Sequence, residues 1–115
     1  MSSIIKIKEN HIFKRAYNKG KAYVCPYAVV YILKNPQGNT KLGITTGKKL
    51  GNAVSRNRAR RVITAAFRSL LPQIASGYSF VIVARVRILS VKSTTVAEAF
   101  SKLLKSAGVY ETEND

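Results

Sequence analysis

The first third of the chain changes from helical to strand spacing of its apolar residues. Between residues 10 and 18 the apolar side chains recur as they do on one face of a helix, and Gly20 is a natural stop. Residues 22–34 are rich in Val, Ile and Tyr, which predicts a strand. Pro26 interrupts it, because proline cannot donate to a sheet ladder. We therefore expect a short strand and then a longer one over 28–34.

The middle of the chain predicts a turn, the second strand of a hairpin and then the longest helix. Residues 35–39, Asn-Pro-Gln-Gly-Asn, have the chemistry of a turn, and residues 40–46 return as a strand. A tight basic connector over 47–51 leads into a helix over 52–71. Asn52 is expected to be the N-cap of this helix, because its short side chain can accept a hydrogen bond from the first turn.

The last third predicts one strand and one helix. The near-continuous apolar run over 80–86 is typical of a central strand covered on both faces. Thr95 and Glu98 have the spacing of a capping box, so the last helix is expected to begin at Thr95. Apolar residues then follow helical spacing as far as Gly108.

Length and apolar content fit a single domain. The chain has 115 residues, 46% of them hydrophobic, which provides a real core and argues against a disordered basic tail. The order α-β-β-β-α-β-α, with no internal repeat, indicates one α+β domain over 1–115. Residues 1–8 are expected to be extended, and both 1–8 and 111–115 are expected to be flexible. No signal peptide or membrane-spanning run is recognisable, and the single cysteine, Cys25, fits a reducing compartment, so a cytoplasmic location is expected.

Positive charge dominates the surface chemistry. Twenty Lys and Arg face five acids, which gives a net charge of +15. Between residues 10 and 97 there are sixteen Lys and Arg and no Asp or Glu. Such a single-sign surface repels itself, so it indicates a polyanionic partner. Nucleic acid is the first candidate and an acidic membrane surface the second.

The helix over 52–71 concentrates that charge on one side. A helical wheel puts its apolar residues on one arc, wide enough to pack on a sheet, and most of its arginines on the other. Like-charge pairs such as Arg56–Arg60 cost roughly 0.2–0.5 kcal/mol each. Arg56 and Arg58 also lie near the positive end of the helix dipole. Since no acid offsets them, we expect the counter-charge to come from phosphates that dock at the helix N-terminus with Lys48 and Lys49.

Aromatic residues in the first third favour single-stranded RNA over DNA. Exposed rings on a sheet are platforms for unstacked bases. Tyr17, Tyr23, Tyr27 and Tyr31 cluster in the sequence with Phe13. Tyr27 and Tyr31 have even spacing, so they are expected to share one face of a strand. The alternative is that Phe13 and Tyr31 are packing residues of the core.

Residues for acid–base or metal-dependent hydrolysis are scarce. His11 is the only histidine, and the acids are absent from the region between residues 10 and 97. General acid–base work needs a tuned Glu, Asp or His near a partner, and nuclease metals need clustered carboxylates. The protein alone is therefore not expected to be a hydrolase, and any catalytic groups should belong to its partner.

The segment over 41–61 resembles the hallmark segment of the bacterial ribonuclease P protein subunit. Lys41-Leu42-Gly43-Ile44 leads through Lys48-Lys49-Leu50-Gly51-Asn52-Ala53-Val54 into Arg56-Asn57-Arg58-Ala59-Arg60-Arg61. The likeness extends from about residue 7 to residue 110. It implies a two-layer α/β sandwich with an uncommon left-handed βαβ crossover, whereas general chain topology predicts a right-handed one.

The resemblance also implies a reaction and its partners. A catalytic RNA would carry the active site and most of the magnesium, and the two together would remove the 5′ leader of precursor tRNA. No catalytic residue or metal ligand of the chain, no membrane and no obligate protein partner are implied. The catalytic RNA would contact Lys48, Lys49, Asn52, Arg56, Asn57, Arg58, Arg60, Arg61 and Arg68. The leader cleft would hold Phe13, Tyr17, Tyr27, Tyr31 and Arg85.

Two departures from the family pattern and two alternative functions remain. Thr64 and Ala65 stand where the family usually has a basic residue and an acid or Gln, and Ser79 stands where it usually has an acid. The charge and α+β layout would equally suit a structural RNA-binding protein such as a ribosomal protein. A DNA-binding regulator is supported by the basic helix alone.

Overall fold

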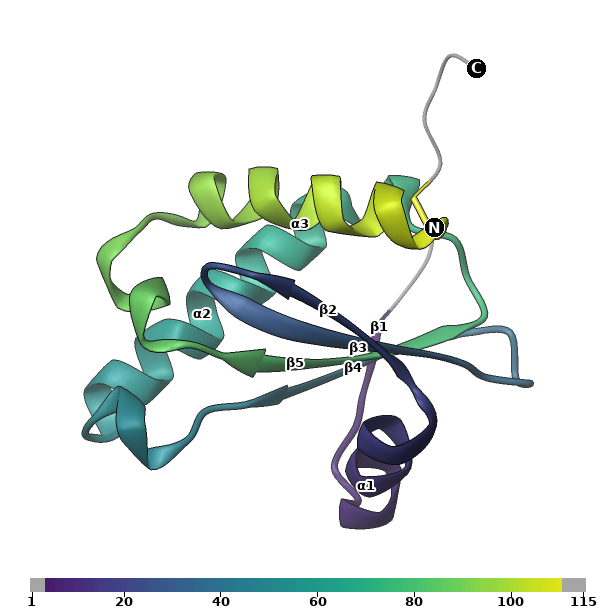
Figure 1. Cartoon of the computed structure of the whole chain (residues 1–115), viewed down its shortest axis with the longest axis horizontal. Helices are drawn as coiled ribbons and strands as arrows, with labels where there is room; N and C mark the ends of the chain where they lie inside the picture. The colour runs from purple at the N-terminus through teal and green to yellow at the C-terminus, as the bar shows by residue number, and fades with distance from the viewer. Residues whose placement is uncertain (1–3, 111–115) are drawn as a thin grey trace.

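The computed structural model describes residues 4–110 as a five-stranded sheet with helices on both faces (Figure 1). The strands lie in the order β1-β4-β5-β3-β2. The elements are β1 (Ile4–Lys6), α1 (Asn10–Lys19), β2 (Lys21–Cys25), β3 (Ala28–Lys34), β4 (Thr40–Thr45), α2 (Ala53–Leu70), β5 (Tyr78–Ala84) and α3 (Ser93–Ala107), with short 3-10 helices η1 (Lys48–Leu50), η2 (Leu71–Gln73) and η3 (Val86–Ser90).

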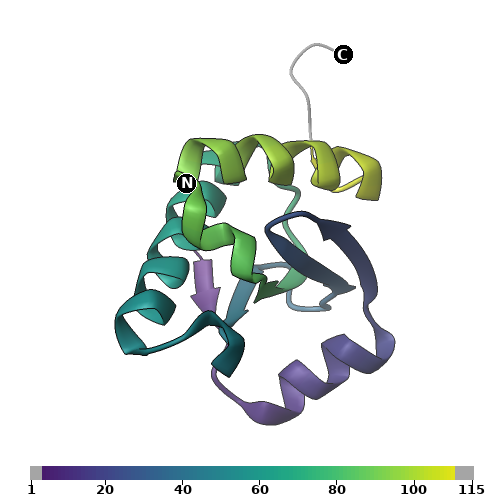
Figure 2. The same ribbon diagram turned by 60° about the vertical axis from the view of Figure 1, so that its left-hand side comes forward.

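The main core lies between the sheet and the two C-terminal helices. Phe67 of α2 meets Phe80 of β5 edge to face, with ring centroids 5.2 Å apart, and Phe100 of α3 is fully buried beside them. These layers confirm the α/β sandwich. Helix α1 lies on the opposite face of the sheet, where Ala16, Val81 and Ile7 form a smaller core, so the sandwich has a partial third layer (Figures 1 and 2).

Strand β5 occupies the position that its apolar run predicts. It pairs with β3 on one side and with β4 on the other, and Phe80, Val81 and Ile82 are completely buried. Alternate residues contact different cores, since Val81 faces α1 while Phe80 and Ile82 face α2 and α3. The strand begins at Tyr78, two residues before the predicted start, and ends two residues before the predicted end.

The connection from β4 through α2 to β5 joins two neighbouring parallel strands. It has the left-handed crossover that the family resemblance implies, against the usual right-handed preference. In the described residues no helix is long and apolar enough to cross a membrane.

The N-terminal segment adds a strand that the sequence pattern did not predict. Ile4–Lys6 forms β1, which pairs in parallel with β4 at the edge of the sheet. The extended character expected of these residues is present, and their pairing partner is 36 residues away, from Ile4 to Thr40, so local spacing could not identify it. The segments 1–3 and 111–115, also expected to be flexible, lie outside the described residues.

The capping box predicted for the last helix does not form. Helix α3 begins at Ser93, and its N-cap is Lys92, which makes no side-chain cap bond. Thr95 and Glu98 therefore lie inside the first two turns. The prediction was wrong because Val91 and Lys92 take extended conformations and the backbone N–H of Thr95 already bonds to the carbonyl of Lys92.

Candidate nucleic-acid interface

Helix α2 separates an apolar stripe from a basic face, as its wheel predicts. Ala59, Val62, Ile63, Ala66 and Phe67 are buried against the sheet and α3. On the other side of the helix every predicted polar contact residue is exposed, namely Asn57, Arg58, Arg60, Arg61 and Arg68. Packing therefore fixes α2 in the fold and leaves five of its predicted RNA-contacting residues in solvent.

The connector before α2 presents lysines next to the helix N-terminus. Leu50 is buried and anchors the 3-10 helix η1, while Lys48 and Lys49 are exposed. Gly51 has a φ of 101°, which favours glycine and lets the chain turn sharply into α2. Asn52 is the N-cap, and its Oδ1 accepts a hydrogen bond of 3.0 Å from the backbone N–H of Ser55. The N-cap prediction is confirmed, and the side-chain amide of Asn52 remains exposed.

Two arginines of α2 bond to the backbone of other elements. Nη2 of Arg58 donates to the carbonyl of Val91 at 3.1 Å, and Nη1 of Arg60 donates to the carbonyl of Ile44 at 3.1 Å. Each guanidinium has further N–H donors that point away from these bonds. Arg56 is half-buried, as expected from its place at the edge of the apolar arc, and its Nε has no hydrogen-bond partner.

A second surface lies on the α1 side of the sheet. Tyr17 of α1 and Tyr31 of β3 meet edge to face, with ring centroids 5.0 Å apart and planes at 71°. Tyr17 is 40% exposed and Phe13 and Tyr31 are half-buried. Val24 of β2 lies on the same face of the sheet and is 65% exposed, so α1 covers only part of this face. Phe13 and Tyr31 pack on the smaller core, as the packing alternative predicts, and each also keeps some exposed surface.

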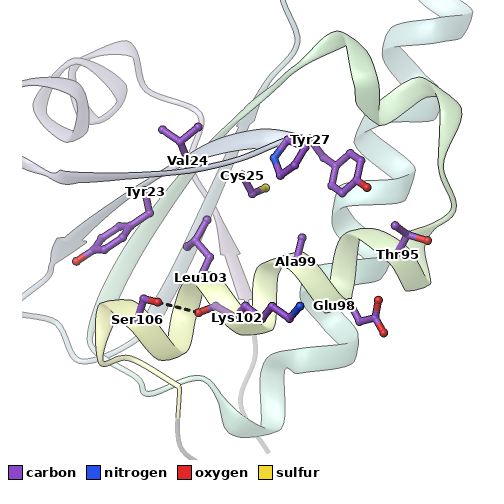
Figure 3. Close-up of a pocket in the computed structure, with 11 residues that line it drawn as sticks. Tyr23, Val24, Cys25, Tyr27, Thr95, Glu98, Ala99, Lys102, Leu103 and Ser106 are labelled. Atoms are coloured by element: carbon purple, nitrogen blue, oxygen red, sulfur yellow. Dashed lines mark hydrogen bonds between the residues drawn. The ribbon is translucent and has the colours of Figure 1, made fainter.

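Tyr27 does not belong to this surface, and the expectation that it shares a face with Tyr31 was wrong. Residues 26 and 27 form the turn between β2 and β3, which breaks the alternation of side chains along a strand. Tyr27 packs against the α2/α3 core, and Figure 3 shows it beside Cys25 and facing α3. It lines a pocket with Tyr23, Thr95 and Glu98.

Arg85 lies between the two surfaces. It is exposed at the end of β5, and its Nη1 donates to the carbonyl of Cys25 at 3.2 Å. A hollow of about 590 Å³ brings it together with Lys48 and Lys49 of the connector. Arg87 lines the same hollow and was missed, although its alternation with Arg85 in the sequence Arg-Val-Arg was a readable signal.

The positions that depart from the family pattern have different environments. Thr64 is half-buried on α2 between Arg60 and Arg68, and Ala65 is exposed. Ser79 is buried in β5, and its Oγ lies 3.4 Å from Nδ2 of Asn35. Among residues 4–110, no three His, Cys, Asp or Glu side chains gather in a way that could hold a metal ion.

Comparison with known proteins identifies one family throughout the chain. The family model described as Ribonuclease P matches residues 1–108. The ribonuclease P protein component of Clostridium beijerinckii is 38% identical over 117 residues, covering 96% of this chain and 94% of that protein. The corresponding protein of Clostridium botulinum is 36% identical and covers 91% and 96%.

Solved structures agree with this result. The RNase P protein of Staphylococcus aureus superposes with a TM-score of 0.81 at 32% identity, over 92% of this chain and 97% of that one. The RNase P protein of Thermotoga maritima gives a TM-score of 0.78 at 28% identity, over 88% and 96%. Membership of this family accounts for the positive charge without the two alternative functions, a ribosomal protein and a DNA-binding regulator.

Proposed function

Since the chain belongs to the bacterial ribonuclease P protein family, and is a subunit of the endoribonuclease that matures tRNA 5′ ends, we propose that it uses two separate surfaces for two RNAs. The catalytic RNA docks on the exposed side of α2 and on the connector before it. The observation that carries this proposal is the division of α2 into a buried apolar stripe and an exposed basic face. Its contact residues are Lys48, Lys49, Asn52, Arg56, Asn57, Arg58, Arg60, Arg61 and Arg68.

The leader of precursor tRNA lies on the α1 side of the sheet. Tyr17 and Tyr31 offer exposed ring surface there, and bases of a single strand stack on such rings. The ring of Phe13 packs on Gly43 of β4 at the base of this surface. Arg85 lines the hollow that also holds Lys48 and Lys49, where the leader would pass the connector. Tyr27 is not part of the proposed cleft, because it faces α3.

The chemistry in this proposal belongs to the RNA. Magnesium prefers oxygen ligands, and phosphates of the catalytic RNA supply them in quantity, so the RNA would bind most of the magnesium. This chain would position the leader and neutralise phosphate repulsion between two RNAs. The protein alone would be inactive, and the whole enzyme would act in the cytoplasm, where precursor tRNA is made.

Precursor tRNA cleavage tests the function directly. The catalytic RNA is assayed at low magnesium concentration with and without this chain, because a basic protein has the greatest effect when few cations screen the RNA. We expect the chain to stimulate cleavage at the mature 5′ end. No stimulation, or stimulation equal to that given by an unrelated protein of the same net charge, would refute the proposal.

A further inference from the structure

A charged groove lies between the edge strand β1 and helix α2. It is a hollow of about 390 Å³ with an apolar floor formed by Ile4, Ile7, Leu42 and Ile44. Its walls carry four cationic side chains and no acid, and they comprise Lys6, Lys8, Arg60, Thr64 and Arg68. Figure 2 shows β1 beside α2, so the two walls come from segments that are far apart in the sequence.

The N-terminal segment supplies both lysines of this groove. Side chains at alternate positions of a strand point to the same face. Ile4 of β1 packs on the α2/α3 core, so Lys6, two residues further along the same strand, points to the α2 side as well. Lys8 follows the end of β1, and it is exposed and lines the groove together with Lys6 and the buried Ile7.

Helix geometry builds the opposite wall. Arg60, Thr64 and Arg68 are spaced by four residues, so they form one row along α2, with a rise of about 6 Å between neighbours. Arg60 is held at the groove by its bond to the carbonyl of Ile44, a floor residue. Arg68 is exposed. The two rows thus run along the same hollow. The two cations of the α2 row, Arg60 and Arg68, are eight residues apart, a rise of about 12 Å, so they suit phosphates that are not adjacent in a strand.

The four cations repel one another, and no acid in the lining offsets this repulsion, so a bound anion would stabilise the groove. We infer that the groove between β1 and α2 binds the sugar–phosphate backbone of one strand of the catalytic RNA, with Lys6 and Lys8 on one side of the strand and Arg60 and Arg68 on the other. This inference rests on the proposed docking of α2 and adds β1 to it. In this arrangement the RNA strand is contacted from two sides, by α2 and by the N-terminal segment.

The position of the groove favours the catalytic RNA over the leader. The groove opens on the α2 side of the sheet, whereas Tyr17 and Tyr31 lie on the α1 side. No tyrosine or phenylalanine lines it, so it offers phosphate contacts and no ring on which a base could stack. Contacts of this kind position a nucleic acid without reading its sequence.

Binding of this chain to the isolated catalytic RNA at several potassium chloride concentrations tests the inference. Each phosphate contact by Lys or Arg contributes about one unit to the slope of log affinity against log salt. The double variant Lys6→Gln/Lys8→Gln keeps the alkyl stems, so it should retain the fold and lower the slope by about 2. The matched control is Lys102→Gln/Lys105→Gln on α3, which should leave the slope unchanged. Equal slopes for the two double variants would overturn the inference.

Thr64→Lys provides a second test that does not depend on removing a group. It puts a cation between Arg60 and Arg68 on the groove wall, and the slope should rise by about 1. An unchanged slope would count against a strand in the groove. Circular dichroism of every variant confirms that the fold is kept.

Two further measurements separate this inference from the function on which it rests. If Arg61→Gln lowers the slope while the β1 variant does not, the groove fails and docking on α2 stands. If neither variant lowers it, both fail. If the β1 variant instead weakens binding of precursor tRNA more than of mature tRNA, the occupant is the leader and the assignment to the catalytic RNA is wrong.

Discussion

The ring of Phe13 lies against the α-carbon of Gly43, so that a β-carbon on residue 43 would come within 2.8 Å of two ring atoms. This contact seats α1 on β4 at the base of the proposed leader cleft. We expect Gly43→Ala to displace Phe13 and to lower the free energy of unfolding by about 1–3 kcal/mol, the usual range for overpacking. Urea denaturation measures the loss.

Gly47→Ala is the matched control for this substitution. Its added β-carbon would meet no atom within 4 Å, and Gly47 has a φ of −78° that alanine adopts readily. Its free energy of unfolding should stay equal or rise by about 0.4–1 kcal/mol, because alanine restricts the unfolded chain. If both variants unfold at the same urea concentration, the close packing of Phe13 on Gly43 has no energetic consequence.

Tyr31→Ala tests the leader cleft. Stacking of one base on an aromatic ring is worth about 1–3 kcal/mol, so the holoenzyme should lose roughly 5- to 150-fold of its affinity for precursor tRNA. Affinity for mature tRNA, which has no leader, should change little. Tyr27→Ala is the control from the opposite face of the sheet, and it should not alter the ratio of the two affinities. A Tyr31 variant with an unchanged ratio would remove this ring from the cleft.

Arg58 and Arg61 separate RNA contact from protein stability. Both are exposed, but Arg58 also donates to the carbonyl of Val91 and so ties α2 to the segment before α3. Arg61→Ala should lower the salt slope of RNA binding by about 1 and leave the free energy of unfolding unchanged. Arg58→Ala should lower the slope equally and also cost about 0.5–1.5 kcal/mol of stability. An equal stability for both variants would show that the bond to Val91 contributes nothing.

The start of α3 gives a prediction in which the sequence pattern and the structure disagree. The capping-box pattern predicts that Thr95→Ala costs about 1 kcal/mol. The structure predicts almost no loss, because Thr95 lies inside the helix. Lys92→Ser should instead stabilise the protein by about 1 kcal/mol, since it puts a capping hydroxyl at the true N-cap. Thermal unfolding of the two variants decides between the two starts.

Local sequence patterns predicted the elements whose determinants are local. The turn at Pro26, the N-cap at Asn52 and the two faces of α2 depend on neighbouring residues, and each was found where the pattern put it. The pairing of β1 with β4 depends on residues far apart in the chain, and no spacing within β1 reveals it. The left-handed crossover runs against the general rule and came only from the family resemblance.

The same distinction applies to the site. The helical wheel correctly predicted the basic face of α2, because the spacing of residues along a helix alone determines which of them share a face. The prediction that Tyr27 and Tyr31 share one face was wrong, because the two-residue turn at 26–27 interrupts the alternation of side chains along the strand. The groove between β1 and α2 could not be predicted, since its walls meet only after the sheet has formed.

Asn52 offers the sharpest separation of helix capping from RNA docking. Its Oδ1 accepts from the N–H of Ser55, and it stands beside the lysines of the connector at the positive end of α2. In Asn52→Asp the carboxylate keeps the cap bond and gains about 0.3–1 kcal/mol from the helix dipole, so the protein should be as stable or more stable. The same negative charge lies where RNA phosphates are proposed to dock, so affinity for the catalytic RNA should fall.

Asn52→Ala should behave in the opposite way. It removes the cap and costs about 1 kcal/mol of stability, but it leaves the charge of the docking surface unchanged, so the salt slope of RNA binding should stay the same. Denaturation and RNA titration of the two variants therefore give opposite rankings if the N-terminus of α2 holds phosphate. If the aspartate variant instead binds RNA as tightly as the unmodified chain, the phosphates dock elsewhere on α2, because a carboxylate within the site would repel them.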